Sequence, residues 1–330
     1  MGVLASAASE RSSRVPGAQR GAGERPTNLD GMNDQPLRQR AATEEKSGAK
    51  RNRERPPAPE PLPHPVMDNH CHLDIADGPA EGDWVTPEAA LDAAAAVGVG
   101  SIVQVGVDLE SSRWSAGLAA EHDRVLAAVA LHPNEAPRLA ERGLLEEHLS
   151  GIEALARDNE RVRCIGETGL DFFRTSEDGL AAQEESFRRH IDIAKRHGKA
   201  LMIHDRKAHD AVLRVLDSEG APERWVMHCF SGDADFAKAC LDRGAHLSFA
   251  GTVTFKNAEG LRDALRVTPR DRILVETDAP FLTPTPFRGR PNASYLVPLT
   301  MRVMAEARGD DLGELCAAVA SSTEAVYGAW

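Results

Sequence analysis

The stretch that decides the fold runs from residue 66 to 74 and reads VMDNHCHLD. Its apolar start predicts a buried strand, and that strand ends in two histidines, His70 and His72. Successive side chains of a strand point to opposite faces, so the two imidazoles share one face while Cys71 faces away. Two imidazoles on one face can hold a metal ion between them.

Carboxylates flank the histidine pair on both sides, and we expect Asp68 and Asp74 to orient the imidazole N–H groups. An isolated His-x-His pair is more often two half-buried histidines than a metal site. The rest of the chain therefore has to decide between these two interpretations.

From residue 66 onward, short apolar runs alternate with Ala-rich segments of helical period, which is the pattern of repeated βα units. The predicted strands are 66–70, 101–106, 125–131, 162–167, 200–204, 225–229, 245–249 and 272–277. The predicted helices between and after them include 87–97, 182–197 and 308–326.

Eight βα units over residues 66–330 match the size of a closed α/β barrel, the (β/α)8 or TIM barrel of about 250 residues. The alternative is an open doubly wound sheet, which binds a nucleotide phosphate on a Gly-rich first turn. Neither GxGxxG nor GxxxxGK[ST] occurs in the chain, and the first strand ends in histidines instead. The sequence therefore predicts the barrel.

Residues 1–60 have a different composition: they lack aromatic side chains and apolar periodicity, which predicts a disordered N-terminal extension. The extension carries 11 Lys/Arg against 8 Asp/Glu. It is either a weak tether to an anionic partner or dispensable.

The chain of 330 residues has a net charge of −12, which argues against binding nucleic acid through a broad basic surface. A nuclease is still possible, because bound divalent cations supply positive charge where the phosphate lies. No apolar run reaches the ~18 residues of a membrane span, and no secretory signal is apparent, so we expect a cytoplasmic protein. The five cysteines form no CxxC pair and are expected to be reduced. No obligate protein partner is evident.

In such a barrel, catalytic residues lie at the carboxyl ends of the strands. The predicted strand ends supply metal-ligand side chains, with two histidines from the first strand. These side chains are His70, His72, His132, Glu167, His204, His228 and Asp278. They exceed the ligands of one tetrahedral zinc site and so predict two divalent metal ions, Zn²⁺, Mn²⁺ or Mg²⁺.

Glu167 is the expected bridge, because its strand lies midway between the strands of the two histidine pairs. Asp278 is expected to bind one metal and to accept the proton of the attacking water. Arg206 and Arg288 lie near the same mouth and suit a phosphate, although a loop salt bridge is an equal interpretation for Arg288.

Residues 66–330 resemble the TatD family of metal-dependent deoxyribonucleases, within the amidohydrolase-like barrels. The resemblance rests on DNHCHLD (68–74), LHPNEA (131–136), IGETGLDFF (165–173), MIHDRKA (202–208), HCFSG (228–232), LVETDAPFLTP (274–284) and RGRPN (288–292).

The resemblance implies one metal on His70, His72 and Asp278 and a second on His204 and His228, with Glu167 bridging. It also implies hydrolysis of DNA, typically as a 3′-to-5′ exonuclease on single strands. One departure bears on the substrate, because Asn134 stands where the family usually has a second histidine after LHP. His132 and this position are expected to contact substrate.

Three rival functions have to be weighed against a nuclease. A binuclear amidohydrolase or lactonase acting at carbon uses the same barrel, but often bridges its metals with a modified lysine where this chain has Glu167. An esterase acting on aminoacyl-tRNA is a closer variant. A non-catalytic scaffold predicts a missing ligand, and none is missing.

Overall fold

The computed structural model of the protein describes residues 33–43, 48 and 50–330, and these described residues belong to one compact unit. Its centre is an eight-stranded sheet in which all neighbouring strands are parallel. The strands are β2 (Val66–Cys71), β4 (Val99–Val105), β5 (Val125–Val129), β6 (Val162–Asp171), β7 (Ala200–Arg206), β8 (Trp225–Met227), β9 (His246–Phe249) and β10 (Ile273–Val275).

The strands follow one another around the sheet in chain order, from β2 to β10. Backbone hydrogen bonds bring the first and last strands together: the Asp278 N–H donates to the His70 carbonyl at 2.9 Å, and the His72 N–H donates to the Ala279 carbonyl at 2.8 Å. The predicted (β/α)8 barrel of the α/β class is confirmed. The largest difference is at β6, which continues four residues beyond its predicted end at Glu167.

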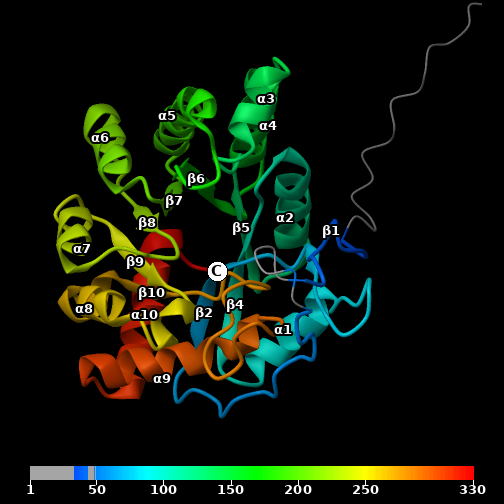
Figure 1. The fold of residues 1–330 in the computed structure, drawn as a ribbon, viewed down its shortest axis with the longest axis vertical. Coiled ribbons are helices and arrows are strands. Elements are labelled where there is room, and N and C mark those ends of the chain that lie inside the picture. The colour runs from blue at the N-terminus through cyan, green and yellow to red at the C-terminus, as the bar shows by residue number, and fades with distance from the viewer. Residues whose placement is uncertain (1–32, 44–47, 49) are drawn as a thin grey trace, which may run out of the picture. The chain divides into compact units, whose positions relative to one another are not determined.

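Helices surround the strands (Figure 1). Within the described part of the chain they are α1 (Pro87–Ala95), α2 (Leu109–Glu121), α3 (Ala136–Glu141), α4 (Leu145–Asp158), α5 (Leu180–Arg196), α6 (His209–Glu219), α7 (Ala234–Leu241), α8 (Glu259–Val267), α9 (Val297–Arg308) and α10 (Leu312–Tyr327). None of these described helices is long and apolar enough to cross a membrane.

Alternation along the strands divides the core into two layers. Val103 and Leu126 belong to a buried cluster that also contains Tyr327 of α10. Their neighbours Ile102 and Ala127 belong to a larger cluster that includes the helices. Both faces of the sheet are therefore buried, which explains why the strands read as nearly continuous apolar runs.

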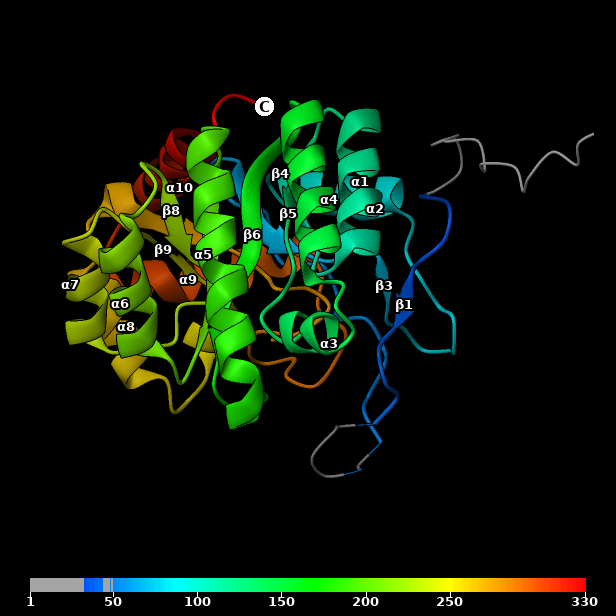
Figure 2. The ribbon, with the colours of Figure 1, turned by 90° about the horizontal axis from the view of Figure 1, so that it is seen from above.

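Part of the stretch expected to be disordered lies against the barrel. A short strand, β1 (Arg38–Gln39), pairs in parallel with β3 (Ile75–Ala76), and Arg51 forms an ion pair with buried Asp77 at 2.8 Å. Figure 2 shows β1 beside β3. Residues 33–43 and 50–60 thus differ from the expected disordered extension in that they contain residues that contact the barrel, while residues 1–32, 44–47 and 49 lie outside the described residues.

Candidate metal centre

The strand ends bring the predicted metal-ligand side chains together. A cleft of about 1000 Å³ opens over them, and His70 lies fully buried beneath its floor. The predicted metal-ligand residues that line the cleft are His72, His132, Glu167, His204, His228 and Asp278.

Glu167 occupies the middle of the group. Its Oε2 atom lies 2.9 Å from His228 Nε2 and 3.4 Å from His70 Nε2, while its Oε1 atom lies 3.0 Å from His132 Nε2. One carboxylate thus contacts imidazoles from three separate strand ends. This is the position that the sequence predicts for a bridging ligand.

His70 and His72 form one side of the centre. Their Nε2 atoms lie 3.0 Å apart, and Asp278 Oδ1 lies 3.5 Å from each of them. The Nδ1–H of His72 donates to the Val105 carbonyl at 3.0 Å, which leaves Nε2 with its lone pair directed into the centre. Two imidazole nitrogens converging on a carboxylate oxygen are a donor set that suits a divalent cation.

His204 forms the opposite side. Its Nε2 atom is buried and has no hydrogen-bond partner among the residues that the structure describes, and Asp171 Oδ2 lies 3.5 Å away. The rings of His204 and His132 are 4.6 Å apart. A bound cation would satisfy the orphaned nitrogen, so the residues on this side also fit a metal.

Three groups of side chains in the described part of the chain have ligand atoms close enough to hold a metal ion. They are His70, His72 and Glu167; His132, Glu167 and His204; and His70, His228 and Glu276. Glu167 belongs to two of them. His132, expected at the substrate, therefore lies within the ligand cluster itself.

Asp68 and Asp74 do not orient the histidine rings, contrary to the prediction. Asp68 accepts from Thr277, through its backbone N–H at 2.9 Å and its hydroxyl at 2.6 Å, and Asp74 accepts from Gln104 at 3.0 Å. Asp68 thus fastens β2 to the segment after β10, and Asp74 fastens the loop after β2 to β4. The sequence gives spacing along the strand, and spacing alone does not show which way these side chains turn.

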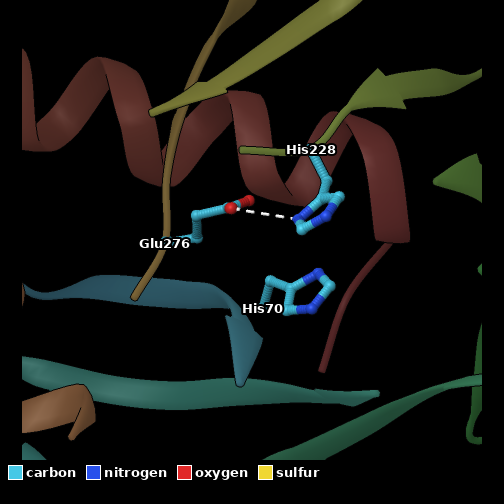
Figure 3. A group of neighbouring side chains, drawn as sticks. All are labelled: His70, His228 and Glu276. Carbon is cyan, nitrogen blue, oxygen red and sulfur yellow. Dashed lines mark hydrogen bonds and ion pairs between the residues drawn. The ribbon is translucent and has the colours of Figure 1, made fainter. Parts of the chain in front are cut away.

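Glu276, which the sequence analysis missed, orients His228. Its Oε1 atom accepts from His228 Nδ1 at 3.1 Å and from the Cys229 backbone N–H at 2.8 Å. Figure 3 shows this contact, with the His70 ring stacked on the His228 ring at 4.0 Å. Because Nδ1 is engaged, His228 presents Nε2 to Glu167.

Asp171 is the second residue that the sequence analysis missed. Besides facing His204, its Oδ2 atom accepts from the Asn134 side chain at 3.2 Å. Gly169 permits this extension of β6, because a Cβ there would lie 2.1 Å from the His204 carbonyl oxygen. The sequence did contain a signal for Asp171. In the LDFF motif (170–173), this aspartate lies four residues beyond the predicted strand end at Glu167.

The buried charges shift the pKa values at the centre. Burial alone would raise the pKa of Glu167. Its contacts with His228 and His132 outweigh burial, so the pKa of Glu167 lies well below its usual range. Burial, together with the neighbouring His228, holds the pKa of His70 well below its usual value. Glu167 is therefore ionised and His70 neutral, which are the forms that bind metal.

The pKa values of two neighbouring histidines shift the other way. Burial alone would lower the pKa of His72, but Asp278 raises it. Burial alone would likewise lower the pKa of His228, but Glu276 and Glu167 raise it well above its usual value.

The backbone at the mouth adopts unusual conformations. Lys207, Cys229 and Asp278 follow β7, β8 and β10, and their φ angles are 60°, 44° and 53°. Such angles are uncommon for residues with side chains and cost of order 1–3 kcal/mol each. Their placement within three residues of the ends of three strands is typical of a functional site.

The two predicted phosphate-binding arginines have different positions. Arg206 lines the cleft, and its guanidinium lies 4.2 Å from the Phe173 ring centroid. Arg288 is not among the described residues that line the cleft; its guanidinium lies 3.9 Å from the Phe255 ring centroid. The structure therefore brings Arg206, but not Arg288, to the candidate site.

A (β/α)8 barrel with histidines and carboxylates gathered at its strand ends defines the class of metal-dependent hydrolases. The model of the family described as TatD related DNase matches residues 67–328. The chain belongs to this family.

Known relatives agree with the family assignment. The chain is 44% identical over 267 residues to a protein named "Uncharacterized metal-dependent hydrolase TatD" from Mycobacterium tuberculosis, a match that covers 80% of this chain and 98% of the relative. The crystal structure of YjjV, a TatD homologue from Escherichia coli, is similar with a TM-score of 0.68 and 27% identity, covering 80% of this chain and 98% of YjjV. A TatD family hydrolase from Entamoeba histolytica shares the fold, with a TM-score of 0.70 and 17% identity over 81% of this chain and 99% of that one.

Proposed function

We propose that the protein is a deoxyribonuclease that hydrolyses phosphodiester bonds with two divalent cations. The observation that carries the proposal is Glu167, whose carboxylate belongs to two of the groups able to hold a metal. His70, His72 and Asp278 would hold one cation and His204 and His228 the other, with Glu167 shared and His132 beside it. When bound, Zn²⁺, Mn²⁺ or Mg²⁺ lowers the pKa of water and neutralises charge that develops on the phosphate.

Asp278 and Arg206 have separate roles in this proposal. The Asp278 carboxylate is 17% exposed and lines the cleft, so it can accept the proton of the attacking water. The Arg206 guanidinium can pair with two oxygens of the phosphate and hold it in line for attack.

The depth of the centre favours a single strand attacked from its end, as in a 3′-to-5′ exonuclease. Glu167 and His228 on the cleft floor are each only 5% exposed. A rigid duplex cannot bring an internal phosphate to such a floor, whereas a strand end can enter the cleft. The family description, TatD related DNase, supports DNA as the substrate.

The test is a comparison of three substrates under one set of metal conditions: labelled single-stranded DNA, an aminoacyl-tRNA and a simple lactone, with Mg²⁺, Mn²⁺ or Zn²⁺. We expect hydrolysis of the DNA and its loss after chelation. Activity on the aminoacyl-tRNA or the lactone alone would overturn the nuclease proposal in favour of an esterase or lactonase.

A further inference from the structure

Residues 33–43 lie beside the metal centre although they precede the part of the chain that matches the family model, which begins at residue 67. The Leu37 N–H donates to the Asp74 carbonyl at 2.9 Å, and the Arg40 N–H donates to the Ala76 carbonyl at 2.9 Å. Since β3 begins three residues after His72, this pairing ties the segment to the loop that follows the first metal-binding strand (Figure 2).

Ion pairs hold the segment in this position. The Asp77 carboxylate is 1% exposed and lies 2.8 Å from Arg51 Nη2 and 3.1 Å from Arg40 Nη1. Arg53 Nε lies 3.9 Å from the same carboxylate, so three guanidinium groups share it. Removing the carboxylate is costly, because it leaves charge at a buried site uncompensated. The segment is therefore anchored rather than loosely laid on the surface.

Arg40 connects the segment to the wall of the centre. Its guanidinium donates to the Pro280 carbonyl and lies 4.8 Å from the Phe281 ring centroid. The Phe281 ring meets the His72 ring edge-on at 6.3 Å. The segment thus contacts the loop that carries Asp278.

Arg38 reaches the cleft itself. It pairs in register with Ile75, and both residues line the cleft. Its Nη2 atom lies 3.0 Å from Asp108 Oδ2, and its side chain remains 32% exposed. The Arg38 guanidinium has five N–H donors, and its contact with Asp108 uses one of them. This contact fixes the direction of the guanidinium.

We propose that Arg38 binds a phosphate of the DNA strand other than the one being cleaved, so that residues 33–43 form part of the substrate cleft. The proposal rests on the phosphodiesterase function proposed above. A guanidinium matches phosphate oxygens in geometry and charge. The cleft volume of about 1000 Å³ lies at the upper end of pockets for small ligands, which suits a run of nucleotides better than a small ester.

The experiment measures the binding of labelled single-stranded DNA against salt concentration, in full-length protein carrying Asp278→Asn to prevent cleavage. Arg38→Ala should weaken binding and reduce the slope of log K against log salt by about 0.7, the value for one lost phosphate contact on a single strand. The matched control is Arg124→Ala, because Arg124 also pairs with a surface aspartate, Asp92, at 2.8 Å but lies outside the cleft. The control should leave affinity and slope unchanged.

Two further measurements keep the outcomes separable. Arg38→Lys retains the charge and should retain the slope with weaker affinity. On a dinucleotide, which has no second phosphodiester, Arg38→Ala in the otherwise unaltered enzyme should leave kcat/KM within about twofold. An unchanged slope in Arg38→Ala, or an equal loss on the dinucleotide, would overturn this inference. Absence of DNA cleavage by the wild-type protein would instead overturn the proposed function.

Discussion

Glu276 offers the sharpest test of how the centre is built, because it contacts His228 on the side away from Glu167. Replacing Glu276 by Gln keeps an acceptor oxygen of similar position for His228 Nδ1 and the Cys229 N–H, at present 3.1 and 2.8 Å away. The change removes the negative charge that makes the imidazole a stronger donor to a metal. It leaves the proposed ligand atoms in place.

The size of the expected loss in metal affinity follows from the role of Glu276 in orienting His228. Loss of a carboxylate behind a metal-binding histidine typically costs 10- to 100-fold in metal affinity or activity. This corresponds to about 1.4 to 2.7 kcal/mol. Glu276 is fully buried, so water does not screen the lost charge, and we expect a value within that range.

The assay is competition for metal between the protein and a chromophoric chelator, for wild type, Glu276→Gln and the control Glu147→Gln. Glu147 is an exposed glutamate of α4, and its replacement should change nothing. Metal affinity of Glu276→Gln within twofold of wild type would refute the reasoning. Loss of one whole equivalent of metal would also refute it, because Glu276 would then be a direct ligand.

Two further predictions concern the stability of the fold. Asp77→Asn should lower the free energy of unfolding by about 3 kcal/mol or more in urea titrations, because buried Arg51 and half-buried Arg40 lose their carboxylate. The exposed control Asp158→Asn should change little, and equal effects of the two substitutions would contradict the anchoring role of Asp77. The second prediction concerns His190, whose pKa is lowered to about 4 by burial. Between pH 6.5 and pH 4, only the unfolded chain binds a proton at this imidazole. The free energy of unfolding therefore falls as the pH falls, by roughly 3 kcal/mol in total. His190→Gln should reduce this fall between pH 7 and 5, and an identical pH dependence in both proteins would contradict the assignment.

The sequence predicts the barrel well because parallel strands buried on both faces leave short apolar runs between amphipathic helices. It also predicts which candidate ligand side chains gather, since they occupy the strand ends and strand ends converge in this architecture. His70, Glu167 and His204 were found by this reasoning. The structure brings all three to one centre.

The remaining features depend on side-chain direction and on ionic contacts, which have no period along the chain. Glu276 lies one residue beyond β10. Its side chain turns towards His228, and this direction has no signature in the sequence. Residues 33–43 have no apolar pattern because Asp77 and two arginines, rather than apolar burial, hold them. A prediction of disorder from composition does not detect such an anchor.

The central claim is that Asp278 acts within a metal-dependent phosphodiesterase centre. The most direct measurement compares degradation of 5′-labelled single-stranded DNA by wild type and Asp278→Asn, in Mn²⁺ and after chelation. We predict progressive shortening from the 3′ end by the wild type, its loss after chelation, and a rate lower by about 10²- to 10⁴-fold in the variant. Equal cleavage by the two proteins, or cleavage that survives chelation, would contradict the claim.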